Sequence, residues 1–371
     1  MVDQSRIKWV QEEMTRHGVE LFAAFTASGH NMGATNSTRV LSGFKNMGDS
    51  CVLLEADGER TVIVSPSWDA ERAREQAPGC NVIASDDLAG AVIKAANRHG
   101  RTRKIGVDGL STLAHRTVAP IRAEWGDRMV QMNGAMQRAG ARKTPDEIRI
   151  AREVAAMAEK IFDRLLEVAR PGMPEYELAS DLYRYSKALG ADDNFLLMAS
   201  SQMPKGPRPP GRRILAKGDL ILGEISPGAD GHFVQICRTA VLGPINEVQQ
   251  RNHDILWESM QAGLAAGAAG NTVAHVANMM NEAVAKHGFA EYCRPPYMRV
   301  RGHGLGSVSS LPGDIGTDNE MVLEEGMTFV MHPNQFLPGG GYMMVGEPVV
   351  ITQTCAEPLT TRFSKLTSIP V

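Results

Sequence analysis

The stretch that decides the fold of this chain is GDLILGEISPGADGHFVQICRTA, residues 218–240. Residues 220–225 and 232–242 are short apolar runs, and runs of this kind are typical of β-strands. We expect the two strands to pair, which brings Glu224 and Gln235 together although eleven residues separate them. This stretch is therefore the first candidate for the chemistry of the protein.

Two later segments add histidine and carboxylate to this pair. The sequence GHGLG, residues 302–306, carries His303, and EGMTFVMHP, residues 325–333, carries His332 and is followed by Glu347. In the fold that the family resemblance described below implies, these side chains converge on Glu224 and Gln235. Two histidines and two carboxylates in a partly buried cleft are typical of an acid–base catalytic site.

The length and the local patterns predict two domains. A chain of 371 residues exceeds one ordinary core. The first third alternates helical and strand patterns, with a hairpin at Asp57-Gly58, and predicts a mixed α/β domain over residues 1–140. Thr144, Pro145 and Glu147 then form a clear helix start. We place the second, catalytic domain at residues 141–371.

Composition excludes several classes of function. Lys and Arg total 39 against 42 Asp and Glu, so the chain lacks the basic field of a general nucleic-acid binder. The sequence contains no run of about 18 apolar residues, so we expect no membrane-spanning helix. The five cysteines stand singly, which favours reduced thiols over disulfides. We expect a cytoplasmic protein that binds neither nucleic acid nor membrane.

Taken in order, the motifs between Thr144 and Thr352 resemble the catalytic domain of the pita-bread family, which includes creatinase, prolidase, aminopeptidase P and methionine aminopeptidase. The N-terminal third is similar to the creatinase/prolidase N-terminal domain through NSTRVLSGF, residues 36–44. The resemblance implies an α/β (α+β) fold in which a mixed α/β domain precedes a pita-bread domain.

The metallopeptidases of this family hold two divalent ions with two Asp, one His and two Glu. The resemblance puts these ligands on Glu224, Gln235, His303, His332 and Gly346, next to Glu347. Two cations about 3.5–4 Å apart need bridging anionic oxygens. Gln235 is neutral and Gly346 has no side chain, so we expect a divergent member without the two-metal site and without proline peptidase activity.

The predicted function is that of a metal-independent, creatinase-like hydrolase with no cofactor. It would cleave a C–N bond (amide, amidine, urea or guanidino) in a small metabolite that carries a carboxylate. His303 and His332 would move protons, and Glu224 and Glu347 would orient them or bind a cationic group. The alternatives are one divalent metal at His303, His332 and Glu347, a lyase, and a non-catalytic binding protein.

Substrate binding is expected from five further side chains. Gln235 would position a ligand, and Arg238 and Arg301 would offer guanidinium groups to a carboxylate. By analogy with related dimers, Arg39 and Trp68 of the partner's N-terminal domain would lie near the active site. We therefore expect a homodimer that acts on a small molecule.

Overall fold

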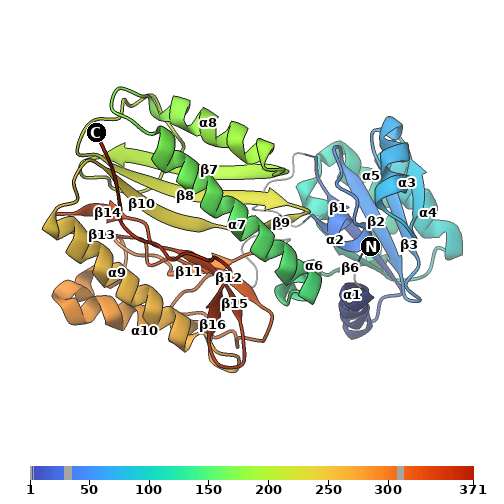
Figure 1. The fold of residues 1–371 in the computed structure, drawn as a ribbon. Helices are drawn as coiled ribbons and strands as arrows, with labels where there is room; N and C mark the ends of the chain where they lie inside the picture. Colours follow the sequence, from blue (N-terminus) through green and yellow to red (C-terminus); the bar gives the residue numbers. More distant parts are fainter. Residues whose placement is uncertain (1, 3, 29–35, 307–312) are drawn as a thin grey trace. The chain divides into compact units, whose positions relative to one another are not determined.

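The computed structural model describes residues 2, 4–28, 36–306 and 313–371 and divides into two compact units, Met1–Thr144 and Pro145–Val371 (Figure 1). The division falls next to the predicted boundary at residue 140. Within the described ranges, no helix is both long and apolar enough to cross a bilayer. The cytoplasmic location stays a prediction.

The first unit is built around one mixed sheet with the strand order β4-β3-β2-β1-β5-β6. Strands β2 and β3 pair in antiparallel fashion on either side of Asp57-Gly58, so the predicted hairpin is confirmed. The elements are α1 (Gln4–His17), β1 (Leu21–Thr26), α2 (Ser37–Ser42), β2 (Ser50–Glu55), β3 (Arg60–Val64), α3 (Ala70–Gln76), β4 (Asn81–Ala84), α4 (Leu88–Ala96), β5 (Ile105–Asp108), α5 (His115–Trp125), β6 (Met129–Gln131) and α6 (Ala135–Ala141).

Helices cover both faces of this sheet because β1 is apolar on both. Phe22 and Ala24 belong to a core with α1, α2, α3 and α6. Leu21 and Phe25 point to the other side and pack with α4 and α5. A strand buried on both faces reads as a continuous apolar run, which is why residues 21–25 show no alternation.

The described residues of the second unit form three sheets and four long helices. The largest sheet has the order β17-β10-β8-β7, with β9 also paired to β8. The next has the order β11-β12-β15-β16, and the smallest is the pair β13-β14. The elements are α7 (Pro145–Val168), α8 (Glu175–Ala188), β7 (Asp193–Ser201), β8 (Leu220–Ala229), β9 (His232–Phe233), β10 (Ile236–Leu242), α9 (Glu247–Ala266), α10 (Val273–Val284), β11 (Gly302–Gly304), β12 (Thr328–Met331), β13 (Gln335–Leu337), β14 (Gly341–Met343), β15 (Glu347–Ile351), β16 (Ala356–Pro358) and β17 (Thr367–Ile369).

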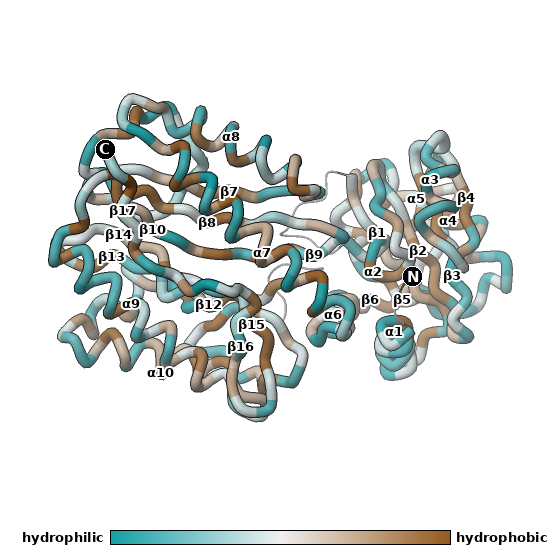
Figure 2. The backbone as a smooth tube through the Cα atoms, in the orientation of Figure 1, coloured by the Kyte–Doolittle hydropathy of each residue, from teal (hydrophilic) through white to brown (hydrophobic). Residues whose placement is uncertain are grey.

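Helices α7 and α8 cover one face of the first sheet. Ala158, Phe162 and Leu165 of α7 pack against Ile221 and Ile225 of β8 in one core cluster. The apolar strands beneath the helices appear brown in Figure 2. The helix start predicted at Pro145 is confirmed, and so is the α/β fold class. Because successive strand residues alternate in direction, Glu224 points to the face that α7 does not cover.

The strand predicted over residues 232–242 is interrupted in the structure. The pairing register of β9 with β8 continues into that of β10 with β8, but Val234 lies opposite Pro227. Proline has no N–H to donate to a ladder, so only the bond from the Val234 N–H to the Pro227 carbonyl forms, at 3.2 Å. The break therefore follows from one proline, and the predicted pairing of the two strands is confirmed.

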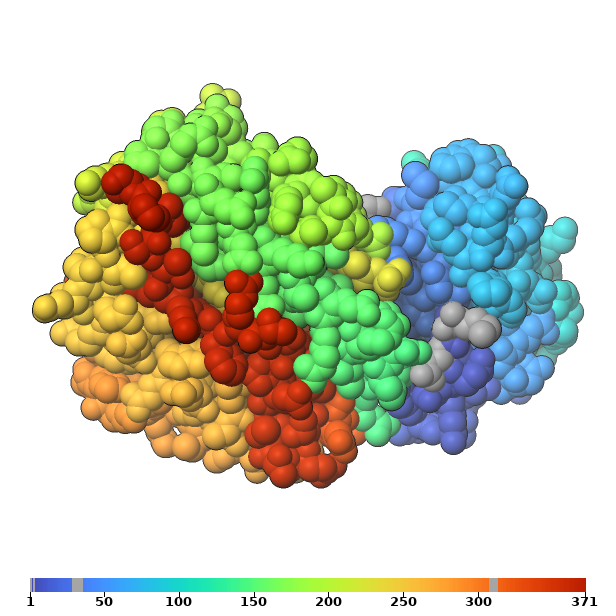
Figure 3. Space-filling model, viewed as in Figure 1, coloured from blue at the N-terminus to red at the C-terminus, as the bar shows by residue number. Residues whose placement is uncertain are grey.

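The C-terminal residues fasten the second unit together. Strand β17 pairs in parallel with β10, and the ring of Phe363 lies 5.2 Å from that of Trp257 of α9, centroid to centroid. Figure 3 shows this segment in red, crossing between the green of α7 and the yellow of α9. Residues 359–371, which we call the C-terminal strap, thus contact elements that lie far apart in the sequence.

We predict that acid destabilises the fold through His253 of α9. This side chain is buried, and burial lowers its pKa to about 4, with Arg238 acting in the same direction and Asp254 opposing. Between pH 6.5 and 4 the unfolded chain binds a proton that the folded chain refuses, so this histidine costs about 2 kcal/mol of stability by pH 5. His253→Gln should show a smaller drop in unfolding midpoint from pH 7 to pH 5 than the wild type. The exposed His275→Gln is the control, and an equal drop in all three proteins contradicts the prediction.

Candidate active site

Four polar side chains share the face of the β8–β10 pair that α7 does not cover. Cys237 lies opposite Glu224 in the antiparallel register, and the same register places Gln235 opposite Ser226. Directly opposed residues, and residues two apart, point to the same face. Ser226 Oγ lies 3.4 Å from Gln235 Oε1, and Gln235 Nε2 lies 3.6 Å from Cys237 Sγ. The predicted proximity of Glu224 and Gln235 is therefore present.

Gly346 joins this face to the second sheet. Its N–H and carbonyl both bond to the backbone of Cys237, at 3.1 Å each. A Cβ at Gly346 would stand only 2.8 Å from the Cβ atoms of Cys237 and His332. The space that a side chain would need at this position is therefore already filled by Cys237 and His332.

His332 in turn contacts His303, and the two rings meet edge to face with centroids 5.4 Å apart. His303 Nδ1 lies 2.9 Å from the Gly304 carbonyl, so it is the protonated nitrogen and Nε2 keeps its lone pair. His332 Nδ1 is buried and has no hydrogen-bond partner among the described residues. The structure thus brings the two predicted histidines together.

Burial keeps both imidazoles neutral. It lowers the pKa of His303, and it lowers that of His332 to about 3, where the nearby His303 and Arg301 act in the same direction. Neutral imidazole is the form that accepts a proton or binds a metal ion. At physiological pH the pair therefore presents lone pairs rather than positive charge.

Glu224 is the carboxylate of this face. It is half-buried, and desolvation raises its pKa to about 7. Its charge is felt by Cys237 and Tyr342, whose pKa values burial already raises. A carboxyl group with a pKa near 7 can both give and take a proton under physiological conditions.

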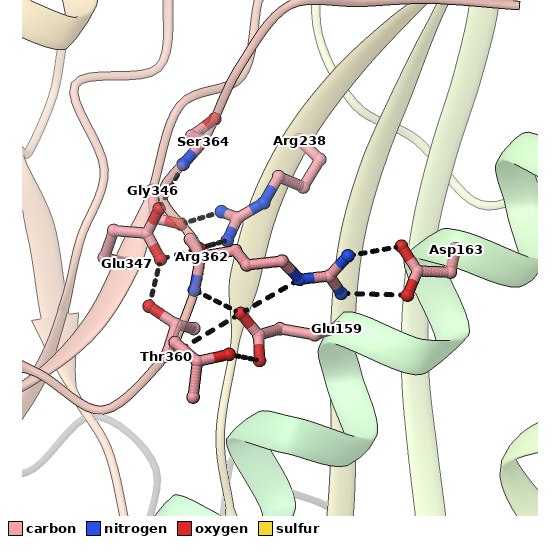
Figure 4. A network of polar contacts seen from close by, with 9 residues as sticks. Glu159, Asp163, Arg238, Gly346, Glu347, Thr360, Arg362 and Ser364 are labelled. Atoms are coloured by element: carbon pink, nitrogen blue, oxygen red, sulfur yellow. Dashed lines mark hydrogen bonds and ion pairs between the residues drawn. The ribbon is translucent and has the colours of Figure 1, made fainter.

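Glu347 and Arg238 point to the opposite face and pair with each other, and their action on substrate stays a prediction. Arg238 donates to Glu347 Oε2 at 3.0 Å and to the Gly346 carbonyl at 2.6 Å (Figure 4). Thr360 Oγ1 and the Ser364 N–H donate to the same carboxylate, at 2.7 and 2.6 Å. Because the strands alternate, Gly346 faces the histidines while its neighbour Glu347 faces α7.

The polar contacts of Figure 4 continue from this ion pair to α7. Glu159 accepts the N–H groups of Thr361 and Arg362, at 3.1 and 2.7 Å. The guanidinium of Arg362 bonds to both oxygens of Asp163, at 2.9 Å each. Two buried carboxylates, Glu159 and Glu347, therefore bind residues of the C-terminal strap.

The remaining predicted substrate-binding residues are Arg301, Arg39 and Trp68. Arg301 is fully buried and reaches Asn281, Gln335 and Cys293. Arg39 and Trp68 belong to the first unit, where Trp68 is 67% exposed. Their contribution to a partner's active site, and the homodimer itself, stay predictions.

Three residues of the site were not predicted from the sequence. Cys237 could have been found, because it follows Gln235 by two residues and so shares its face. Asn334 donates to Cys237 Sγ at 3.3 Å and accepts the Val345 N–H at 2.8 Å. Nothing in its local pattern indicates this, nor does anything indicate that Tyr342 lies near Glu224.

The tight contact at Gly346 gives a prediction for stability. Gly346→Ala should destabilise the protein by about 1–3 kcal/mol, because the new methyl group overlaps Cβ atoms that the backbone holds in place. The matched control is Gly206→Ala, where an added Cβ meets nothing within 4 Å. Thermal unfolding of both variants checks this, and an unchanged midpoint for Gly346→Ala would contradict the packing described.

Residues 149–353, more than half of the 371, match the metallopeptidase family M24. The curated relatives include the uncharacterized peptidase YqhT of Bacillus subtilis, 22% identical over 92% of this chain and 95% of its own length. They also include the Xaa-Pro dipeptidase of Pyrococcus furiosus, 24% identical over 86% of this chain and 89% of its own.

Solved structures show the same fold over nearly the whole chain. The X-Pro aminopeptidase from Thermotoga maritima superposes with a TM-score of 0.85 at 21% identity, covering 98% of this chain and 99% of its own. The prolidase from Pyrococcus horikoshii superposes with a TM-score of 0.84 at 20% identity, covering 97% and 99%. The predicted pita-bread fold is confirmed.

These matches overturn two expectations. Because the family is one of metallopeptidases and its named relatives are Xaa-Pro dipeptidases, the expected metal-independent, creatinase-like hydrolase of non-peptide bonds is wrong. The expectation that no cofactor is needed is contradicted by the same family membership. The loss of carboxylates argues against a pair of cations, but it does not argue against the single divalent metal that the sequence left open as an alternative.

The donor atoms of this chain nevertheless do not fit a pair of metal ions. Gln235 is neutral. Gly346 has no side chain, and the space beside it is filled by Cys237 and His332. Among the described residues, no three His, Cys, Asp or Glu side chains gather closely enough to hold a metal ion. The unpartnered Nδ1 of His332 and the lone pair on His303 leave two imidazole donors, and imidazole is the side chain that most commonly binds metal ions in proteins.

The matched residues run from within α7 to just past β15 and contain Glu224, His303 and His332. Sequence and fold therefore agree that this chain belongs to the metallopeptidase family M24.

Proposed function

We propose that this chain hydrolyses the amide bond of short peptides and that the activity requires one divalent cation bound by His303 and His332. The observation that carries the proposal is the pair of neutral imidazoles in contact with each other, with centroids 5.4 Å apart. The substrate class is supported by the Xaa-Pro dipeptidases among the relatives.

The histidines are prepared for this role by their surroundings. The Gly304 carbonyl fixes the tautomer of His303 and leaves Nε2 available, and a backbone partner of this kind is typical of metal-binding histidines. His332 is a neutral imidazole at physiological pH, so one of its ring nitrogens has a free lone pair and a cation does not have to displace a second proton. With only two protein ligands, the affinity for the cation should be low.

A bound divalent cation supplies Lewis-acid polarisation of the scissile carbonyl. The proton transfers are then the work of Glu224. Because its pKa is about 7, its ionised form can take a proton from the attacking water, and its protonated form can give one to the leaving amine. Gln235 lies on the same face, and its amide can orient the substrate or Cys237.

We predict that hydrolysis depends on added cation. Protein treated with chelator should leave glycyl-L-proline and alanyl-L-proline intact, and Mn²⁺ or Co²⁺ should restore hydrolysis, measured as released proline. His303→Ala should raise the Mn²⁺ concentration needed for half-maximal rate, because it removes one of two imidazole donors. If neither peptide is cleaved by the wild type with any of Mn²⁺, Co²⁺ or Zn²⁺, the proposal fails.

Glu224 provides the sharpest variant. Glu224→Gln keeps the size of the side chain but cannot accept a proton, so we expect kcat to fall by roughly 100-fold or more. The matched control is Glu320→Gln, because Glu320 is exposed on the surface of the second unit and should leave the rate unchanged. Equal rates in the two variants would remove Glu224 from the mechanism.

A further inference from the structure

Arg301 is a buried cation without an acidic partner. Its side chain is fully buried, and it donates to Asn281 Oδ1 at 2.7 Å, to Gln335 Oε1 at 2.8 Å and to Cys293 Sγ at 3.4 Å. All three acceptors are neutral, and no ion pair joins Arg301 to a carboxylate in the part of the chain that the structure describes. Arg238, by contrast, is equally buried but is paired with Glu347.

This arrangement leaves a positive charge and hydrogen-bond donors unused. A guanidinium has five N–H groups and stays charged in proteins, and the three contacts occupy three of them. Gln335 is also fully buried, and its Nε2 has no partner among the described residues. Gln335 cannot turn its amide around, because its oxygen already accepts from Arg301. What is missing at this place is an acceptor with negative charge.

The group lies beside the candidate active site. The Arg301 carbonyl accepts the His332 N–H at 2.9 Å. Its charge helps to lower the pKa of His332 and opposes the burial that raises the pKa of Tyr342, which also feels Glu224. The guanidinium of Arg301 thus acts on His332 and Tyr342, which belong to the candidate active site.

We propose that Arg301 and Gln335 form a subsite for a carboxylate group of the substrate, such as the C-terminal carboxylate of a dipeptide. The inference deepens the proposed function and rests on it for the identity of the site. A carboxylate has two oxygens in one plane, which match the planar fork of a guanidinium. It would supply the counter-charge that Arg301 lacks and the acceptor that Gln335 Nε2 lacks.

The test places a carboxylate of the protein itself next to Arg301, where the substrate carboxylate is proposed to bind. Gln335→Glu puts a carboxylate 2.8 Å from the guanidinium, at the position of the present amide oxygen. Asn281→Asp does the same from α10, at 2.7 Å from Nε. We expect both variants to unfold at a higher temperature than the wild type, because they neutralise a buried charge. Gln137→Glu, at an exposed position of the first unit, is the matched control.

Binding is measured by calorimetry with glycyl-L-proline and with glycyl-L-prolinamide, without added cation so that the peptides stay intact. In the wild type and in Gln137→Glu, the free acid should bind roughly 10-fold or more tightly than the amide, as expected for charge-assisted hydrogen bonds. In Gln335→Glu and Asn281→Asp this preference should disappear. Equal binding of acid and amide by the wild type, or a preference that both variants retain, overturns the subsite.

The outcome is separable from that of the proposed function. Selective binding of the free acid without hydrolysis under any cation would uphold the subsite and refute the peptidase proposal. Hydrolysis of acid and amide with equal kcat/KM would uphold the peptidase proposal and refute the subsite.

Discussion

The candidate site depends on one buried guanidinium, that of Arg238. It bonds to the carbonyl of Gly346 and to the carboxylate of Glu347, and so ties β10 to the start of β15. Since neighbouring strand residues face opposite ways, this same tie presses Gly346 against Cys237 and His332 on the other side. A loss of Glu347 would leave a buried charge unpaired, which costs several kcal/mol, and would loosen the contact that shapes the site.

The charges of the side chains in the site determine how many cations it can hold. A site for two metal ions needs several carboxylates to offset the repulsion between cations, whereas Gln235 and Gly346 contribute no carboxylate beside Glu224. The two imidazoles are neutral, and the charge of Arg301 lies close to His332. The histidines should therefore bind a cation with low affinity until an anionic substrate group offsets the positive charge of Arg301. In this account the substrate's carboxylate and the metal ion promote each other's binding.

Much of this arrangement could be predicted from the sequence, because it rests on short-range patterns. Pairing of the strands around Glu224 and Gln235 follows from their apolar runs, and the start of α7 follows from Pro145 and Glu147. The ordered motifs around His303 and His332 indicated the pita-bread fold. The break at Pro227 could have been foreseen, since proline cannot serve a ladder.

The direction of Glu347 could not be predicted, because one residue of register separates Gly346 from it and reverses the side chain. Its partners Thr360 and Ser364 come from the C-terminal strap, which shows no pattern in the sequence. The partners of Arg301 lie on α10 and β13, far away in the chain. The function was mispredicted for a different reason: the loss of a two-ion site favoured a metal-free hydrolase over the single-metal alternative, and the residues alone could not decide between the two.

The most direct measurement is the number of manganese ions that each chain retains at equilibrium, determined by dialysis against Mn²⁺ followed by elemental analysis. The account predicts one ion per chain, released on transfer to metal-free buffer and absent in His303→Ala. The account would be contradicted by two ions per chain that survive such transfer. That result would show that Gln235 and the close packing at Gly346 do not prevent a two-ion centre.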